Sequence, residues 1–160
     1  MELYKECIMD WRPDEREREA LGLYIKLKRS ISSVERRIAQ QKPLPERLTV
    51  SQFAVLEALF FHGDLQQSVI AQKILSSTAN LTFVLDNLVK AGYVKRTSDD
   101  HDRRIKTISL TEAGKTMISE VFPVMARAIT ESVSVLEVEE MKRVSGLLKI
   151  LGTGQRPEHK

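Results

Sequence analysis

Two groups of side chains in the middle of the sequence have the types and spacing needed to bind phosphates and base edges. The first group places small hydroxyl residues just before further polar residues: Ser76, Ser77, Thr78, Asn80, Thr82 and Asn87. Hydroxyl groups at a helix N-terminus supplement the unpaired backbone N–H groups there, and together they favour phosphate oxygens. Asparagine and threonine side chains further along such a helix can hydrogen-bond to base edges in the major groove. This group predicts a helix that binds DNA through its N-terminal half.

The second group lies in residues 98–104, where two adjacent arginines share a short segment with three aspartates. Aspartates repel DNA unless one of them has a structural role. Asp102, two residues before Arg104, can hold the guanidinium in one orientation through a charge-assisted hydrogen bond. An arginine held in this way suits a narrow minor groove, where the negative potential is strongest. Arg103, Lys95 and Arg96 are then expected to contact phosphates, which adds affinity but little sequence specificity.

A helix that starts at Ser76–Ser77 and ends at Gly92 must position the first group. Its buried face is predicted by apolar residues at positions i, i+3, i+4 and i+7: Leu81, Val84, Leu85 and Leu88. Asn80, Thr82, Phe83 and Asn87 therefore point away from the core. Two strand-like segments follow at residues 93–97 and 105–110, and their connection makes the arginine pair the tip of a β-hairpin.

Two further helices are predicted in front of this one. Thr49 and Gln52 form a capping box that opens a helix ending at Gly63. Asp64, with Gln67 three residues later, predicts the start of a short helix. The order helix, short helix, polar-tipped helix and charged hairpin is that of a winged helix-turn-helix. We predict a mainly α fold (α+β) with a small β-hairpin wing and a DNA-binding lobe over residues 48–111.

Long helices flank this lobe at residues 14–40, 111–135 and 138–151, the second containing Pro123, which is expected to bend it. Their apolar stripes are too long to be covered by the small lobe alone, so a symmetric partner is expected. Residues 12–42 and 112–152 are thus predicted to be dimerisation helices within one chain of 160 residues. The alternative is a monomer in which these helices pack on each other.

Five segments resemble the MarR family of bacterial transcription regulators: TVSQFAVL (49–56), LTFVLDNL (81–88), GYVKR (92–96), DDHDRR (99–104) and LTEAG (110–114). The resemblance implies a homodimer on a pseudo-palindromic operator, acting as a repressor that a small ligand or an oxidant releases. It also implies that Arg104 is the minor-groove arginine and Asp102 its partner. Two residues depart from the family pattern. Phe83 stands where a polar or basic residue is common, so it contacts thymine methyls or sugars or packs internally, and Asp100 replaces the usual proline.

The stimulus is not specified by the sequence. Cys7 is a candidate oxidant sensor, but Glu6 and Asp10 nearby disfavour its thiolate. A small aromatic or phenolic effector is the other candidate, in a crevice between the dimerisation helices and the lobe. Five residues are candidates to line it, although ordinary core or surface positions are the simpler explanation: Tyr24, Lys28, Phe53, Phe60 and His62.

Composition excludes several other classes of protein. The chain carries a net charge of +3, and its single cysteine rules out an intramolecular disulfide or a thiolate zinc site. There is no nucleophile–histidine arrangement or phosphate-binding glycine loop, so we predict neither an enzyme nor a bound cofactor or metal. No apolar run is long enough to span a membrane, which predicts a cytoplasmic protein. One rival function is left, a winged-helix module that binds proteins without reading DNA.

Overall fold

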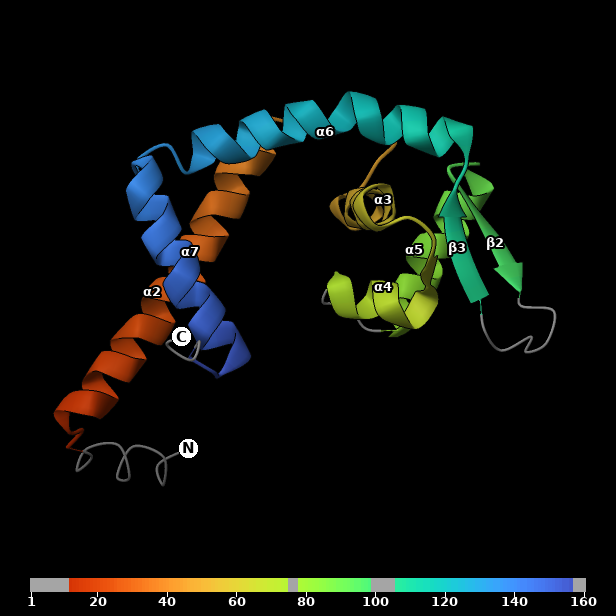
Figure 1. Ribbon diagram of the computed structural model, residues 1–160. Helices are drawn as coiled ribbons and strands as arrows, with labels where there is room; N and C mark the ends of the chain where they lie inside the picture. Colours follow the sequence, from red (N-terminus) through yellow and green to blue (C-terminus); the bar gives the residue numbers. More distant parts are fainter. Residues whose placement is uncertain (1–11, 75–77, 99–105, 157–160) are drawn as a thin grey trace, which may run out of the picture. The chain divides into compact units, whose positions relative to one another are not determined.

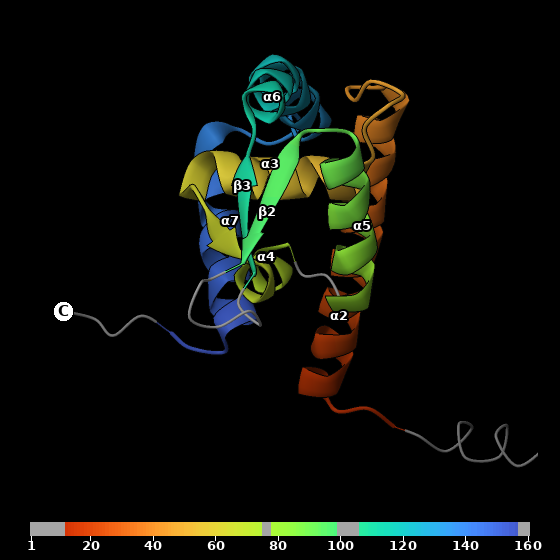
Figure 2. The ribbon, with the colours of Figure 1, turned by 90° about the vertical axis from the view of Figure 1, so that its right-hand side faces the viewer.

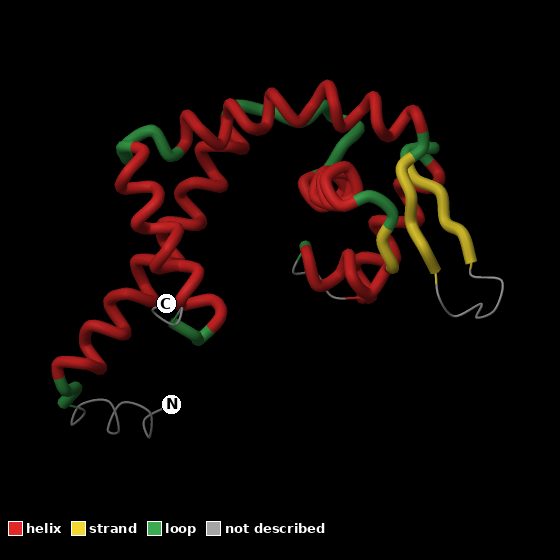
Figure 3. Tube along the Cα trace, viewed as in Figure 1, coloured by secondary structure: helices red, strands yellow, loops and turns green. Residues whose placement is uncertain are grey.

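The computed structural model describes residues 12–74, 78–98 and 106–156. Helices and strands follow one another in the order α2 (Glu15–Gln40), α3 (Val50–His62), β1 (Leu65–Gln66), α4 (Gln67–Lys73), α5 (Thr78–Lys90), β2 (Val94–Ser98), β3 (Lys106–Leu110), α6 (Glu112–Ser132) and α7 (Val138–Thr153) (Figures 1 and 3). The chain forms two compact units, residues 1–40 and 41–160. The predicted fold class, mainly α with a small antiparallel sheet, is confirmed.

Helix α3 begins and ends where local sequence predicted. The side chain of Thr49 accepts a hydrogen bond from the Gln52 backbone, and the Gln52 side chain accepts one from the Thr49 backbone. This reciprocal pair satisfies two of the backbone donors that every helix leaves unpaired at its start. At the other end, Gly63 adopts a φ of 73°, a conformation that glycine takes without strain, and its N–H bonds to the Leu59 carbonyl.

The segment after α3 differs from its prediction. Asp64 and Gln67 were expected to open a helix, but Leu65 and Gln66 form the short strand β1, and α4 starts at Gln67 without a side-chain cap. The Gln67 side chain has another partner, because its amide donates to the hydroxyl of Thr82 on α5 at 2.9 Å. Strand β1 pairs with β3, which makes a three-stranded sheet in the order β1-β3-β2.

The core of the second unit lies between α3, α5, the sheet and α6 (Figure 2). The apolar face of α5 is buried as its spacing predicted, from Leu81 to Leu88. The other elements of this unit each contribute fully buried side chains to the same core: Leu56 on α3, Ile70 on α4, Ile108 on β3 and Ile118 on α6. A core of this kind fixes the orientation of α5, since interiors are packed too tightly for the helix to turn about its axis.

The β2–β3 hairpin has its root fastened to the start of α6. The strands lie within one residue of their predicted bounds and pair from Val94↔Leu110 to Ser98↔Lys106. Thr111 caps α6, as predicted, by accepting from the Gly114 backbone at 3.1 Å. Its own N–H and hydroxyl bond to the carbonyls of Tyr93 and Gly92, at 3.0 and 2.6 Å. Gly114 lies directly against the Tyr93 carbonyl, where a side chain has no room.

Helix α6 continues through Pro123 and ends at Ser132, three residues before its predicted end. A bend at the proline stays a prediction. Near its end, the side chain of Gln41 donates to the Ala128 carbonyl and to the Ser132 hydroxyl, at 3.2 and 3.3 Å. Helix α7 has a capping box of its own between Glu137 and Glu140.

Neither α2 nor α7 contains a buried residue, although both helices carry apolar stripes. On α2 the exposed apolar side chains are Leu21, Leu23, Tyr24, Ile25 and Ile31. On α7 they are Val138, Val144, Leu147, Leu148 and Leu151. Apolar surface of this extent on two helices is unusual for a chain with no partner. None of the described helices is long and apolar enough to cross a bilayer.

Candidate nucleic-acid interface

The outer face of α5 carries the polar side chains that the sequence assigned to it. Asn80 and Thr82 are exposed and Asn87 is half-buried, while Leu81 and Leu85 on the opposite side are completely buried. This division between the two faces is confirmed. Thr78 is the first residue of the helix, but its side chain, like Ser76 and Ser77, lies outside the described residues.

Phe83 is exposed on this same face. Its relative accessible surface is 68%, the largest among the apolar residues described on α5. Internal packing, one of the alternatives from the sequence, is therefore ruled out for this side chain. Covering an apolar ring that is exposed to water with another surface lowers the free energy.

Arg96 does not project outward as the sequence suggested. Its Nη1 lies 2.9 Å from Oδ1 of Asp86 on α5, and its side chain is only 25% exposed. Its Nε and Nη2 atoms are buried, without a hydrogen-bond partner among the described residues. The ion pair joins β2 to α5 and neutralises an aspartate on the face that would meet DNA. This role was missed, although an acid among groups that bind phosphate already required a compensating cation.

Lys95 lies on the other side of the hairpin, because successive residues of a strand alternate between its faces. It pairs in register with Ser109 and lines a hollow of about 570 Å³ with Asp64, Glu112 and Lys115. A hydrogen bond from Lys115 at 2.8 Å, together with its charge, lowers the pKa of Glu112, and the pKa of Lys115 is raised for the same reasons. Lys95 is thus held away from the Asp86–Arg96 pair.

The hairpin tip cannot be compared with its prediction. Asp102, Arg103 and Arg104 lie outside the described residues, and so does Cys7. Their proposed roles stay predictions. Among the described residues, no group of three or more histidine, cysteine, aspartate or glutamate side chains could hold a metal ion.

The residues suggested for an effector cavity are distributed over several places. Phe53 is 6% exposed and belongs to the core, so its position is explained by packing alone. Phe60 lines the hollow that contains Lys95, whereas His62 lines a different one. Tyr24 and Lys28 are neighbours on α2, with the Lys28 Nζ 5.8 Å from the centre of the Tyr24 ring.

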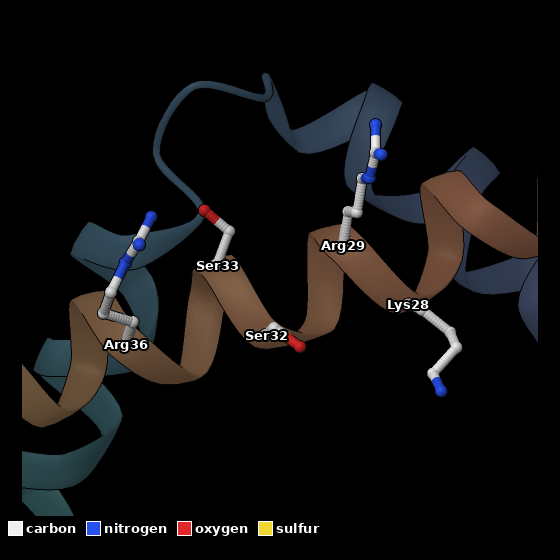
Figure 4. A pocket seen from close by; sticks show the side chains of 5 residues that line it. All are labelled: Lys28, Arg29, Ser32, Ser33 and Arg36. Atoms are coloured by element: carbon white, nitrogen blue, oxygen red, sulfur yellow. The ribbon is translucent and has the colours of Figure 1, made fainter.

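The surface of α2 around Lys28 is basic. A shallow hollow of about 430 Å³ is lined by Lys28, Arg29, Ser32, Ser33 and Arg36. Arg29, Ser33 and Arg36 point to one side of the helix and Lys28 to the other (Figure 4). These side chains do not converge on a common point, and the charges are those of a solvated helix face.

The hollow beside His62 has a more specific lining. It measures about 560 Å³ and lies between α3 and the end of α4, with Ala54, Glu57, Ala58, Phe61, His62, Lys73 and Ile74 around it. The Lys73 Nζ and the His62 Nε2 are 3.2 Å apart, within hydrogen-bonding distance. Phe61 is fixed edge-on against Phe122 of α6, with ring centres 5.1 Å apart. The Lys73 ammonium and the His62 ring thus lie in the same hollow as the aromatic ring of Phe61.

Comparison with known proteins gives a consistent result. A sequence model of the MarR family matches residues 48–106. The HTH-type transcriptional regulator MhqR of Bacillus subtilis is 32% identical over 142 residues, which cover 88% of this chain and 97% of that protein. The structure of reduced AbfR bound to DNA is similar at 28% identity with a TM-score of 0.67, over 86% of this chain and 96% of that one.

A third similar structure is that of Bordetella bronchiseptica BpsR, whose DNA binding is regulated by 6-hydroxynicotinic acid. It is 23% identical, with a TM-score of 0.73, and the match covers 82% of this chain and 98% of BpsR.

Proposed function

Because the chain belongs to the MarR family of DNA-binding transcription regulators, we propose that it is a homodimeric repressor of a pseudo-palindromic operator, released by a small ligand. Family membership also confirms that the chain is not an enzyme. It disfavours the rival function, a winged-helix module that binds only proteins.

The proposal is carried by the outer face of α5, where hydrogen-bonding side chains project opposite a fully buried apolar face. In our proposal, this helix enters the major groove, and Asn80, Thr82, Phe83 and Asn87 face the base edges. The N-terminal residues Ser76, Ser77 and Thr78 bind phosphates.

The β2–β3 hairpin is proposed to reach the neighbouring minor groove with Arg104, oriented by Asp102, while Arg103 binds a phosphate. The sequence also predicts phosphate contacts for Lys95 and Arg96. The Arg96–Asp86 ion pair supports a different function for Arg96, namely to hold the hairpin against α5. Lys95 is left as a weaker candidate, since it lines a hollow on the other face of the hairpin.

The dimer is supported by the uncovered apolar stripes of α2 and α7. In our proposal, these helices pack against those of a second copy, so that the dimerisation segments are residues 12–42 and 112–152. Two-fold symmetry then places two copies of α5 about 34 Å apart, one turn of B-DNA.

The effector is proposed to bind in the hollow between α3 and α4. An aromatic acid or phenolate fits its lining, since the ring can stack near Phe61 while the negative charge meets Lys73 and His62. BpsR, a protein of the same fold, responds to a hydroxylated aromatic acid. Release of DNA by a panel of benzoates and phenols, measured with native protein and Lys73→Met, tests this site: the variant is expected to need a higher ligand concentration.

The proposal as a whole is tested by DNA binding over a range of salt concentrations. The operator is first isolated by sequencing the genomic fragments that the purified protein retains, and its affinity is then compared with that of random DNA. We expect a specificity ratio of at least about 10³, and a steep loss of affinity as salt rises. Equal, weak binding to both DNAs at all salt concentrations would support the protein-binding module instead.

Variants then test the assignment of the hairpin tip. Arg103→Ala and Arg104→Ala are each expected to weaken operator binding and to reduce the dependence of log Kd on log salt concentration by about one. Arg47→Ala removes the same charge from an exposed position outside both the DNA-binding lobe and the proposed dimerisation segments and serves as the control.

A further inference from the structure

We propose that Phe83 selects operators with thymine at the position it faces, by apolar contact with the thymine 5-methyl group. This inference rests on the proposed binding of α5 in the major groove. It adds a specificity determinant that polar contacts do not supply. It also assigns a function to an exposed aromatic ring on a helix whose other apolar residues lie mostly in the core.

The direction of the side chain follows from helix geometry. The buried residues Leu81, Val84, Leu85 and Leu88 define the inward direction of α5. At about 100° per residue, Phe83 points roughly 150° away from their mean direction. Its exposure of 68% agrees with this, so the ring projects from α5 toward whatever the outer face contacts.

The neighbours of Phe83 argue for DNA rather than protein as its partner. On a helix, residues three and four apart are adjacent, and these positions hold Ala79 and Asn80 on one side and Asp86 and Asn87 on the other. A single large apolar ring whose neighbours are one alanine and three polar residues is not the continuous patch that a protein interface requires. The apolar stripes that need a second copy of the chain lie on other helices, α2 and α7.

Electrostatics at this position also allow close approach to DNA. Asp86 would repel phosphates next to the ring, but Arg96 neutralises it at 2.9 Å. Among the chemical groups at the edges of base pairs in the major groove, the thymine methyl is the apolar one. A phenylalanine cannot bond to the acceptors and donors of the other bases. Contact between the Phe83 ring and the thymine methyl is therefore favourable, because it removes apolar surface of both groups from water.

The experiment uses the full-length protein and an operator in which each thymine is replaced in turn by deoxyuridine, which lacks only the methyl group. Loss of one buried methyl corresponds to about a three- to fivefold rise in Kd. For the native protein we expect this rise at one or two thymines in each half-site. For Phe83→Ala we expect the same positions to show no difference between thymine and deoxyuridine. At such a position, 5-methylcytosine paired with guanine should restore part of the affinity that unmethylated cytosine loses.

Two results would overturn the inference. One is a native protein that binds the operator specifically but is indifferent to every deoxyuridine. The other is a Phe83→Ala variant that loses affinity while keeping the native pattern of deoxyuridine effects, because the ring would then contact sugars. Neither result affects the proposed function, which fails only if specific operator binding itself is absent. The ring contributes nothing to the core, so the thermal unfolding of Phe83→Ala should match that of the native protein.

Discussion

Replacing Gly114 by alanine tests the packing of the hairpin root against α6. A Cβ at this position would lie 2.0 Å from the carbonyl oxygen of Tyr93 and 2.9 Å from its carbonyl carbon, distances that real Cβ atoms essentially never show. The obstacle is backbone and cannot rotate aside. The Tyr93 carbonyl also accepts the Thr111 N–H at 3.0 Å, so moving it away weakens that hydrogen bond.

The magnitude follows from these contacts. Overpacking of a tight site destabilises by about 1–3 kcal/mol, and the weakened hydrogen bond adds about 1 kcal/mol. The better helix propensity of alanine offsets up to about 1 kcal/mol of this. The net loss in the free energy of unfolding is about 1–4 kcal/mol, or roughly 2–16 °C in Tm for a chain of this length.

Urea denaturation followed by circular dichroism, at one fixed protein concentration, measures the effect. Gly22→Ala is the matched control, because the same change inside α2 brings the new Cβ within 4 Å of no described atom beyond its chain neighbours and the backbone of its own helix. It should leave stability unchanged or raise it by up to about 1 kcal/mol. A Gly114→Ala protein as stable as the native one would show that the hairpin root can shift freely, and the reasoning would be wrong.

Three further predictions concern ion pairs and the dimer. Asp86→Ala should lower the free energy of unfolding by about 1–2 kcal/mol, because Arg96 then keeps a largely buried charge without its partner. The double variant with Arg96→Met should recover part of that loss, which a double-mutant cycle measures. Leu147→Glu combined with Leu151→Glu should shift sedimentation from dimer to monomer and weaken operator binding; a native chain that sediments as a monomer with and without DNA would contradict the dimer. Glu112→Gln should lower stability at neutral pH. The folded pKa of Glu112 lies below its usual 4.5, so this difference should shrink as the pH falls through that range in acid unfolding.

Elements encoded by neighbouring residues were predictable from the sequence. The capping box at Thr49, the cap at Thr111 and the two faces of α5 each depend on residues within a few positions of one another. Such local patterns determine where a helix starts and which side it buries, with little influence from the rest of the chain.

Features that depend on distant partners were missed. Strand β1 is two residues long, too short for any periodicity, and exists because β3 lies beside it. The Asp86–Arg96 pair forms only because the fold brings β2 alongside α5. From the sequence, Phe53 fits a ligand cavity as well as a core, because an aromatic residue suits either, and only the packing around it distinguishes the two.

Strand β1 couples parts of the lobe that would otherwise move separately. It joins β3 on one side and leads directly into α4, whose first residue, Gln67, is bonded to Thr82 on α5. We therefore expect a displacement at the α3–α4 junction to reach the hairpin and α5 together, so that the lobe moves as one rigid body. In the proposed dimer, an effector bound there would change the spacing between the two DNA-binding lobes. The DNA-facing surface of each lobe would stay the same. Partly released protein should then prefer the same base sequence as before, only with lower affinity.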